Sequence, residues 1–172
     1  SRLSRSRRRR GLHPAWRSTA ADGGAEPQSL ASGLGLRGAA MSQAEQVVSD
    51  FMAAFNAMDI DAIVAAFTDD AVYHNMPGPP VEGRSAIEAV IRGYLGLASA
   101  MDWRIAYQAE VAPGVVLNER LDRFKLAKGW LELPVMGAFE VVDGKIAKWR
   151  DYFDMADFQR QLAAQRGEGE AG

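Results

Sequence analysis

The sequence predicts an α+β fold in which a curved, mixed but mostly antiparallel sheet wraps around N-terminal helices and forms a cone with a deep pocket. Two observations predict it. Apolar residues recur at helical spacing between residues 43 and 94, whereas from residue 102 onward they alternate with polar residues, as in strands. When helices come first and a run of strands follows, the helices usually pack against one face of an antiparallel sheet.

Two helices are expected at the start of the domain. Ser42 followed by Glu45 is a capping box, which predicts the beginning of an amphipathic helix over residues 43–58. A short second helix fits residues 60–67, and the pair Asp69–Asp70 is expected to end it.

A short strand, a loop and a third helix are expected next. The stretch AVYHN, residues 71–75, has the pattern of a strand, and MPGPP, residues 76–80, has too many prolines for regular structure. Ser85 with Glu88 forms a second capping box, which predicts a helix that continues through Tyr94.

The second half of the domain predicts four strands and a last helix. Pro113-Gly114 and Asp143-Gly144 mark two of the turns, and Asp143-Gly144 is a strong hairpin signal. The final helix is expected over residues 155–165, with Phe158 and Leu162 facing inward. The expected strands cover residues 102–111, 115–124, 129–141 and 145–153.

Composition restricts the chemistry that the chain can perform. Among 172 residues there is no cysteine, which excludes disulfides, thiolate nucleophiles and cysteine-based metal sites. Only His13 and His74 could supply an imidazole. No phosphate loop, nucleotide motif or metal cluster is recognisable, and no apolar run approaches the roughly 18 residues that cross a bilayer. The chemistry is therefore expected to depend on carboxylates.

Charge divides the chain near Met41. Residues 1–40 contain eight arginines against two acidic residues, whereas residues 41–172 contain 12 basic and 20 acidic residues. We interpret residues 1–40 as a disordered leader or non-native extension, residues 41–166 as the folded domain and residues 167–172 as a flexible tail. A functional basic arm or a transit peptide is the alternative for the leader.

Three groups of polar residues interrupt apolar strand faces. In LNERLDRF, residues 117–124, alternation places Asn118, Arg120 and Asp122 on one face. In the strand KIAKWRDYFD, Ala147, Trp149, Asp151 and Phe153 share a face, and Ile146 falls on the other. Tyr73 and Asn75 share a face of the strand AVYHN.

Each group has an ordinary explanation as well as a functional one. An Arg-x-Asp pair is often an exposed ion pair of little energetic value. Asp151 could cap the turn before the last helix, although Asp154 is better placed for this. All three groups would open into one cavity, however, and their joint occurrence favours a functional site.

These motifs in this order resemble the limonene-1,2-epoxide hydrolase family, which belongs to the fold group of nuclear transport factor 2 and cystatin-like cones. The resemblance rests on YHNMPGPP followed by GR, then ERLDRF, then WRDYFD, and it covers about residues 41–165. It implies a catalytic triad of Asp122, Arg120 and Asp151, with Tyr73 and Asn75 positioning a water molecule.

The resemblance also implies a reaction and its partners. Asp151 would be the base toward water and Asp122 the acid toward the epoxide oxygen, with their carboxyl groups about 6–9 Å apart by analogy with inverting glycosidases. The enzyme would be a cytoplasmic homodimer without cofactor or metal, acting on a small apolar, terpene-like epoxide and water, and binding neither nucleic acid nor membrane. Its expected pocket residues are Met76, Leu95, Trp130, Leu133, Phe139, Trp149 and Phe153. An isomerase or polyketide-cyclase-like enzyme of the same fold, or a non-catalytic binding module, remains the alternative.

Overall fold

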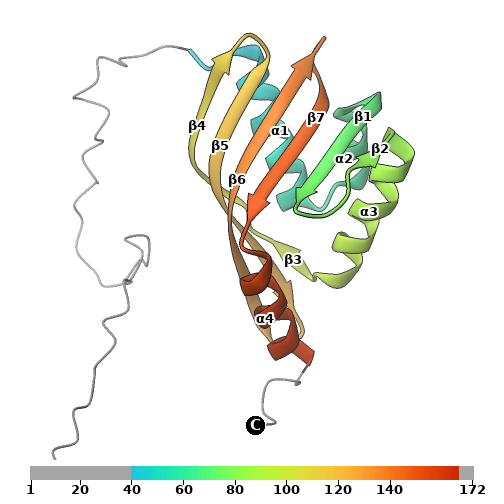
Figure 1. Cartoon of the computed structure of the whole chain (residues 1–172), viewed down its shortest axis with the longest axis vertical. Coiled ribbons are helices and arrows are strands. Elements are labelled where there is room, and N and C mark those ends of the chain that lie inside the picture. Colours follow the sequence, from blue (N-terminus) through green and yellow to red (C-terminus); the bar gives the residue numbers. More distant parts are fainter. Residues whose placement is uncertain (1–39, 167–172) are drawn as a thin grey trace, which may run out of the picture. The chain divides into compact units, whose positions relative to one another are not determined.

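Residues 40–166 are described by a computed structural model, and the expected leader and tail lie outside them, apart from residue 40. The elements run in the order predicted, with two short strands in addition, and Figure 1 shows them. They are α1 (Gln43–Ala57), α2 (Ile60–Ala65), β1 (Phe67–Met76), β2 (Val81–Glu82), α3 (Arg84–Leu97), β3 (Ala100–Met101), β4 (Arg104–Ala112), β5 (Val115–Leu126), β6 (Gly129–Val142), β7 (Lys145–Phe153) and α4 (Met155–Arg166).

The strands form one sheet in the order β2-β1-β7-β6-β5-β3, with β4 also paired to β5. All pairings are antiparallel except that of β1 with β7, so the sheet is mixed but mostly antiparallel, as predicted. In Figure 1 the long strands β4 to β7 curve across the molecule, α1 and α2 lie on one side of the sheet, α3 lies beside β1 and β2, and α4 lies along the end of β6. The predicted α+β cone is therefore confirmed.

The predicted turns and caps at three positions agree with the structure. Ser42 and Glu45 form the capping box of α1, with the Ser42 Oγ accepting from the Glu45 amide at 3.1 Å. Asp143 and Gly144, with φ of 49° and 75°, form the left-handed turn of the β6–β7 hairpin. Asp154 caps α4, because its Oδ1 accepts from the amide of Asp157 at 3.0 Å.

Two helix boundaries differ from the prediction. The Ser85–Glu88 capping box does not form, because α3 begins at Arg84 behind Gly83, whose positive φ of 85° turns the chain directly out of β2. The pair Asp69–Asp70 does not end α2. That helix ends at Ala65, and β1 already begins at Phe67, whose fully buried ring fixes the strand against the core.

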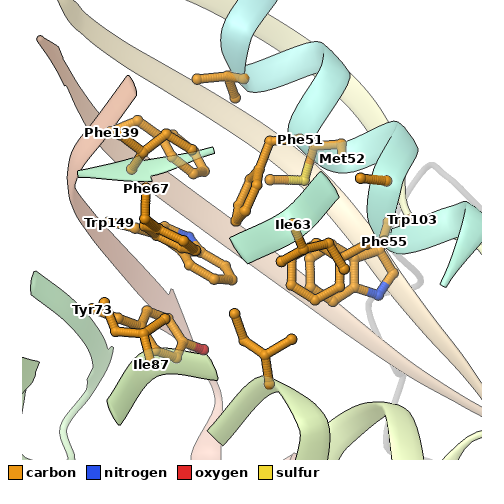
Figure 2. Close-up of a cluster of buried hydrophobic side chains, with 14 of the residues drawn as sticks. Phe51, Met52, Phe55, Ile63, Phe67, Tyr73, Ile87, Trp103, Phe139 and Trp149 are labelled. Carbon is orange, nitrogen blue, oxygen red and sulfur yellow. The ribbon is translucent and has the colours of Figure 1, made fainter. Parts of the chain in front are cut away.

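An aromatic cluster fills the space between α1 and the sheet. The ring of Phe51 makes edge-on contacts with Phe55, Phe67 and Trp149 at centroid distances of 5.2, 5.2 and 5.1 Å. Figure 2 shows these rings packed together with Phe139 and Met52. Edge-on ring pairs add stability beyond the area they bury, so this cluster holds β7 firmly against the helices.

Candidate active site

The polar side chains of β5 point into the cone. Asn118, Arg120 and Asp122 are only 2%, 2% and 3% exposed, whereas Leu117 and Glu119, at the alternate positions, face outward. The alternation predicted from the sequence is therefore correct, and the charges on the inner face are buried rather than solvated.

β7 supplies a third charged side chain to the same region. Trp149 and Asp151 are buried, as the alternation predicts, but Ile146 is buried as well, contrary to expectation. The reason is a bulge: Val141 of β6 pairs with Ile146 while Glu140 pairs with Lys148, so the residue between them is extra. An extra residue shifts the alternation by one position, and this shift lets one strand bury both Ile146 and Asp151.

Arg120 joins the two aspartates. Its Nε and Nη2 donate to the two carboxylate oxygens of Asp122 at 2.8 and 3.1 Å, and Nη2 also donates to Oδ2 of Asp151 at 2.5 Å. Nη1 donates to the Asn118 side-chain oxygen at 3.2 Å. The guanidinium carbon also lies 5.4 and 6.0 Å from the ring centres of Trp103 and Trp149. Five donors in a planar fork suit arginine to this bidentate contact.

The two carboxylates approach each other closely through one oxygen of each. Oδ2 of Asp122 and Oδ2 of Asp151 both contact the same nitrogen of Arg120. The distance between these two oxygens therefore cannot exceed the sum of the two contacts, so at their nearest oxygens the carboxylates lie closer than the about 6–9 Å expected by analogy with glycosidases. The cause is the shared guanidinium, which draws both carboxylates toward one point.

Burial shifts the acidities of the pair. Removal from water, together with the charge of Asp151, raises the pKa of Asp122 to about 7 against the opposing pull of Arg120. Burial also raises the pKa of Asp151, opposed by Arg120 and by a hydrogen bond from Trp149. Burial would lower the pKa of Arg120, but the two carboxylates outweigh it and hold that pKa above its usual range. Arg120 therefore stays charged.

Trp149 makes a polar contact that the sequence did not predict. Its indole Nε1–H donates to Oδ1 of Asp151 at 2.7 Å, so both oxygens of this carboxylate accept from a buried donor. Hydrogen bonds to a carboxylate favour its ionised form. Among the described residues Asp122 accepts from Arg120 alone and is repelled by Asp151, so its surroundings favour the neutral form more than those of Asp151 do.

Tyr73 and Asn75 of β1 lie next to Asp151. The parallel register pairs Tyr73 with Trp149 and Asn75 with Asp151, and the Tyr73 ring stacks on the Trp149 ring at a centroid distance of 4.1 Å. Burial, followed by the neighbouring Tyr94, raises the pKa of Tyr73 well above its ordinary value. Tyr73 therefore remains a neutral phenol that can donate a hydrogen bond.

A cavity of about 300 Å³ opens in front of these groups. Tyr73, Asn75, Asp122 and Asp151 reach its wall, whereas Arg120 lies behind the carboxylates with a fully buried side chain. The rest of the wall is mostly apolar and comes from α3, the sheet and α4; it includes Val90, Tyr94, Leu97, Trp103, Phe124, Leu126, Leu131, Leu133, Val135, Phe153, Met155, Phe158 and Leu162. Of the seven predicted pocket residues, Leu133 and Phe153 line it.

The other five predicted pocket residues lie elsewhere. Phe139 and Trp149 are fully buried in the aromatic core, and Leu95 packs against the outside of that core. Met76 ends β1 opposite Tyr152. Trp130 is 37% exposed, and its ring is covered by Arg123, whose guanidinium carbon lies 4.5 Å from the ring centre. These five side chains belong to the core or the surface rather than to the cavity wall.

Within residues 40–166, no three His, Asp or Glu side chains are grouped closely enough to hold a metal ion. In the same part of the chain no helix combines the length and apolar character that a membrane span requires.

Residues 42–164 match the family model of the limonene-1,2-epoxide hydrolase catalytic domain. The chain belongs to the limonene-1,2-epoxide hydrolase family. A curated relative, epoxide hydrolase EphG from Mycobacterium tuberculosis, is 32% identical over 120 residues, which cover 67% of this chain and 76% of EphG.

Solved structures agree with this family. The structure of a limonene-epoxide-hydrolase-like epoxide hydrolase from M. tuberculosis is 30% identical, has a TM-score of 0.63 and covers 73% of this chain and 92% of its own. A protein from Catenulispora acidiphila with a ketosteroid isomerase-like fold is 18% identical and has a TM-score of 0.61. The match covers 71% of this chain and 92% of that protein's chain. The second likeness shows the shared fold only.

Gly137 leaves the space that Arg120 occupies, a role that no sequence pattern indicates. On β6 it pairs with both Asn118 and Asp151. A Cβ added there would lie 2.5 Å from the Asn118 side-chain oxygen and 2.8 Å from the Phe139 ring, and would also clash with Nη1 of Arg120.

We therefore expect Gly137→Ala to displace the Arg120 guanidinium and to lower the free energy of unfolding by about 1–3 kcal/mol, as overpacking does. The control is Gly93→Ala in α3, where an added Cβ meets nothing within 4 Å. That change is expected to be neutral or to stabilise by up to about 1 kcal/mol. Urea denaturation measures both. Equal stabilities for the two variants would contradict the steric role of Gly137.

A second prediction concerns pH. The pKa of Asp122 is raised to about 7, so the folded chain holds this proton more tightly than the unfolded chain does. The resulting stabilisation is complete below about pH 4 and is lost as the pH rises through about 7. Asp122→Asn does not titrate. The unfolding free energy of this variant minus that of the wild type should therefore increase from pH 4 to 7, by on the order of 1 kcal/mol or more. A difference that is constant or decreases over this range would contradict the raised pKa.

Proposed function

We propose that the protein hydrolyses a small apolar, terpene-like epoxide to a vicinal diol, in one step by general acid and base catalysis, without a covalent intermediate. Membership of an epoxide hydrolase family supports hydrolysis of an epoxide. The observation that carries the proposal is the pair of buried carboxylates that share Arg120 at the wall of a mostly apolar cavity.

In this mechanism Asp151 is the base. Arg120 and Trp149 donate to its two oxygens and stabilise the ionised form. Asp151 accepts a proton from a water molecule that Tyr73 and Asn75 help to hold at the cavity wall. The oxygen of this water attacks an epoxide carbon as the proton leaves.

Asp122 is the acid. Because its pKa is raised to about 7, it holds a proton at and below neutral pH. It transfers this proton to the epoxide oxygen as the carbon–oxygen bond breaks, which avoids releasing an unstable alkoxide. The product diol carries one hydroxyl from the added water and one from the epoxide oxygen, which has taken the proton of Asp122. A proton passing from Asp151 to Asp122 afterwards restores the starting state.

Arg120 permits this division of roles. It remains charged throughout, so the triad is electrically neutral when one aspartate is ionised and the other is protonated. Ionising both would leave a net negative charge in a site removed from water, which is costly. The close approach of the two carboxylates strengthens this effect, and it keeps one proton on the pair.

The cavity supports the proposed substrate class. Its volume of about 300 Å³ lies at the small end of ligand sites. Leu131, Leu133 and Phe124 from the sheet and Phe158 and Leu162 from α4 give it an apolar wall. A compact hydrocarbon epoxide would fill this space and expose only its oxygen to Asp122.

The test is hydrolysis of a panel of small epoxides by the wild type, Asp122→Asn and Asp151→Asn. We expect each variant to lose about 10²–10⁴-fold in kcat while it keeps its circular dichroism spectrum, because each change removes one proton transfer. Asp69→Asn is the control, because the Asp69 side chain is 85% exposed. Full diol formation by either site variant would contradict the assigned roles.

A single turnover in oxygen-18 water separates direct hydrolysis from a covalent ester. Direct attack places the label in the diol during the first turnover, whereas an ester would place it in an aspartate first. The same assay identifies the alternatives. An isomerase or cyclase would give a product of unchanged mass, and a binding module would give no product.

We also propose that the enzyme is a cytoplasmic homodimer that needs no cofactor. Met136 pairs with Tyr152 across β6 and β7, and both are about half exposed on the outer face of the sheet, with Leu117 on β5 also exposed. These apolar side chains support a dimer formed through this face. Light scattering after size-exclusion chromatography is expected to give twice the mass of one chain. Met136→Lys should lower the measured mass toward that of one chain. A monomer at micromolar concentration would contradict the dimer.

A further inference from the structure

Tyr94 brings a third polar side chain to the wall around the proposed water. It lies on α3, three and seven residues after the fully buried Ile91 and Ile87, so helical spacing turns it toward β1. Its hydroxyl accepts from Nδ2 of Asn75 at 2.9 Å, and both residues line the cavity.

The same tyrosine lies near the other water-positioning residue. Burial raises the pKa of Tyr73 well above its ordinary value, and the next contributions come from Tyr94 and then Asp151. Tyr73, Tyr94 and Asp151 are therefore close neighbours at one part of the wall. Neither the order of the residues nor their spacing in the sequence shows this, because α3 and β1 meet only in the folded chain.

We propose that Tyr94 is a positioning residue, which fixes the side-chain amide of Asn75 so that its carbonyl oxygen accepts a hydrogen bond from the attacking water. This inference rests on the proposed function. The amide has one acceptor end and one donor end. Because Nδ2 is held by Tyr94, Oδ1 is the end left for the water.

The orientation of this amide affects how well the water attacks. A water molecule that donates one hydrogen to Asp151 and the other to Oδ1 of Asn75 keeps its lone pairs for the epoxide carbon and for the Tyr73 hydroxyl. If the amide were reversed, its NH₂ group would donate to the water and compete with the carbon for a lone pair. Acceptors on the water also increase the electron density on its oxygen. Tyr94 therefore acts on the reaction through Asn75.

A double-mutant cycle tests the inference on the full chain. Tyr94→Phe keeps the ring and removes only the hydroxyl. We expect it to lower kcat about 3–10-fold, the effect of one lost hydrogen bond, with KM changed less than twofold. In an Asn75→Ala background the same change should leave kcat within about 1.5-fold, because the residue through which Tyr94 acts is absent. Equal losses in both backgrounds would overturn the inference.

Tyr107→Phe is the matched control. Tyr107 is 70% exposed on β4, so removing its hydroxyl should change neither kcat nor KM. Melting temperatures of all variants distinguish positioning from packing. If the lower kcat of Tyr94→Phe were explained by a smaller fraction of active protein and were restored on cooling, the role of Tyr94 would be purely structural. That result would overturn the inference.

A spectroscopic measurement separates this inference from the proposed function. In the nitrogen-15 spectrum, one side-chain NH of Asn75 should be shifted downfield by its bond to Tyr94 in the wild type. In Tyr94→Phe it should move to the position of a solvated amide, whereas Tyr107→Phe should leave it in place. Unchanged Asn75 signals would overturn the inference. If the wild type forms no diol from any epoxide but the Asn75 signals move as expected, the proposed function is wrong. The hydrogen bond between Tyr94 and Asn75 is still supported in that case.

Discussion

The site depends on one buried cation, the guanidinium of Arg120. A charge removed from water is costly unless every donor is matched, and here two carboxylates and the Asn118 amide oxygen accept from it. The surrounding structure accommodates this group. β6 lacks a side chain at Gly137, where one would collide with the guanidinium, and the indole rings of Trp103 and Trp149 lie within about 6 Å of it. The hydrophobic core therefore continues up to the edge of a charged network.

That arrangement gives the two aspartates different acidities although they share a partner. Asp151 is held at both oxygens by donors from two different side chains, while Asp122 has only the guanidinium and is repelled by its neighbour. Two identical residues thus acquire different acidities from their surroundings, as in other enzymes that pair a carboxylate with a carboxylic acid. The aromatic core contributes directly, because Trp149 packs against Phe51 with its ring and donates to Asp151 with its nitrogen.

The sequence predicted the parts of this molecule that follow from local periodicity. Alternation in β5 placed Arg120 and Asp122 on one face, which is the buried one, and the Asp143-Gly144 turn predicted the hairpin. Prediction from the sequence failed where contacts between distant segments decide the position of a side chain. The indole of Trp149 was expected on the cavity wall but lies in the core. Tyr94 was expected only as a residue of the third helix, because its contact requires α3 and β1 to be placed together. Gly137 carries no pattern at all; only the position of the arginine across the sheet explains it.

The bulge in β7 has a consequence for how such a site arises during evolution. If Ala147 followed the regular alternation instead of forming the bulge, a strand that buries Ile146 would bury Arg150 and turn Asp151 to solvent. Whether this added residue is absorbed in a bulge thus decides whether the aspartate belongs to the surface or to the triad. Related cones can therefore change strand length and still keep an inward carboxylate, provided that a bulge absorbs the change. Comparing such proteins by substitutions alone would miss this feature.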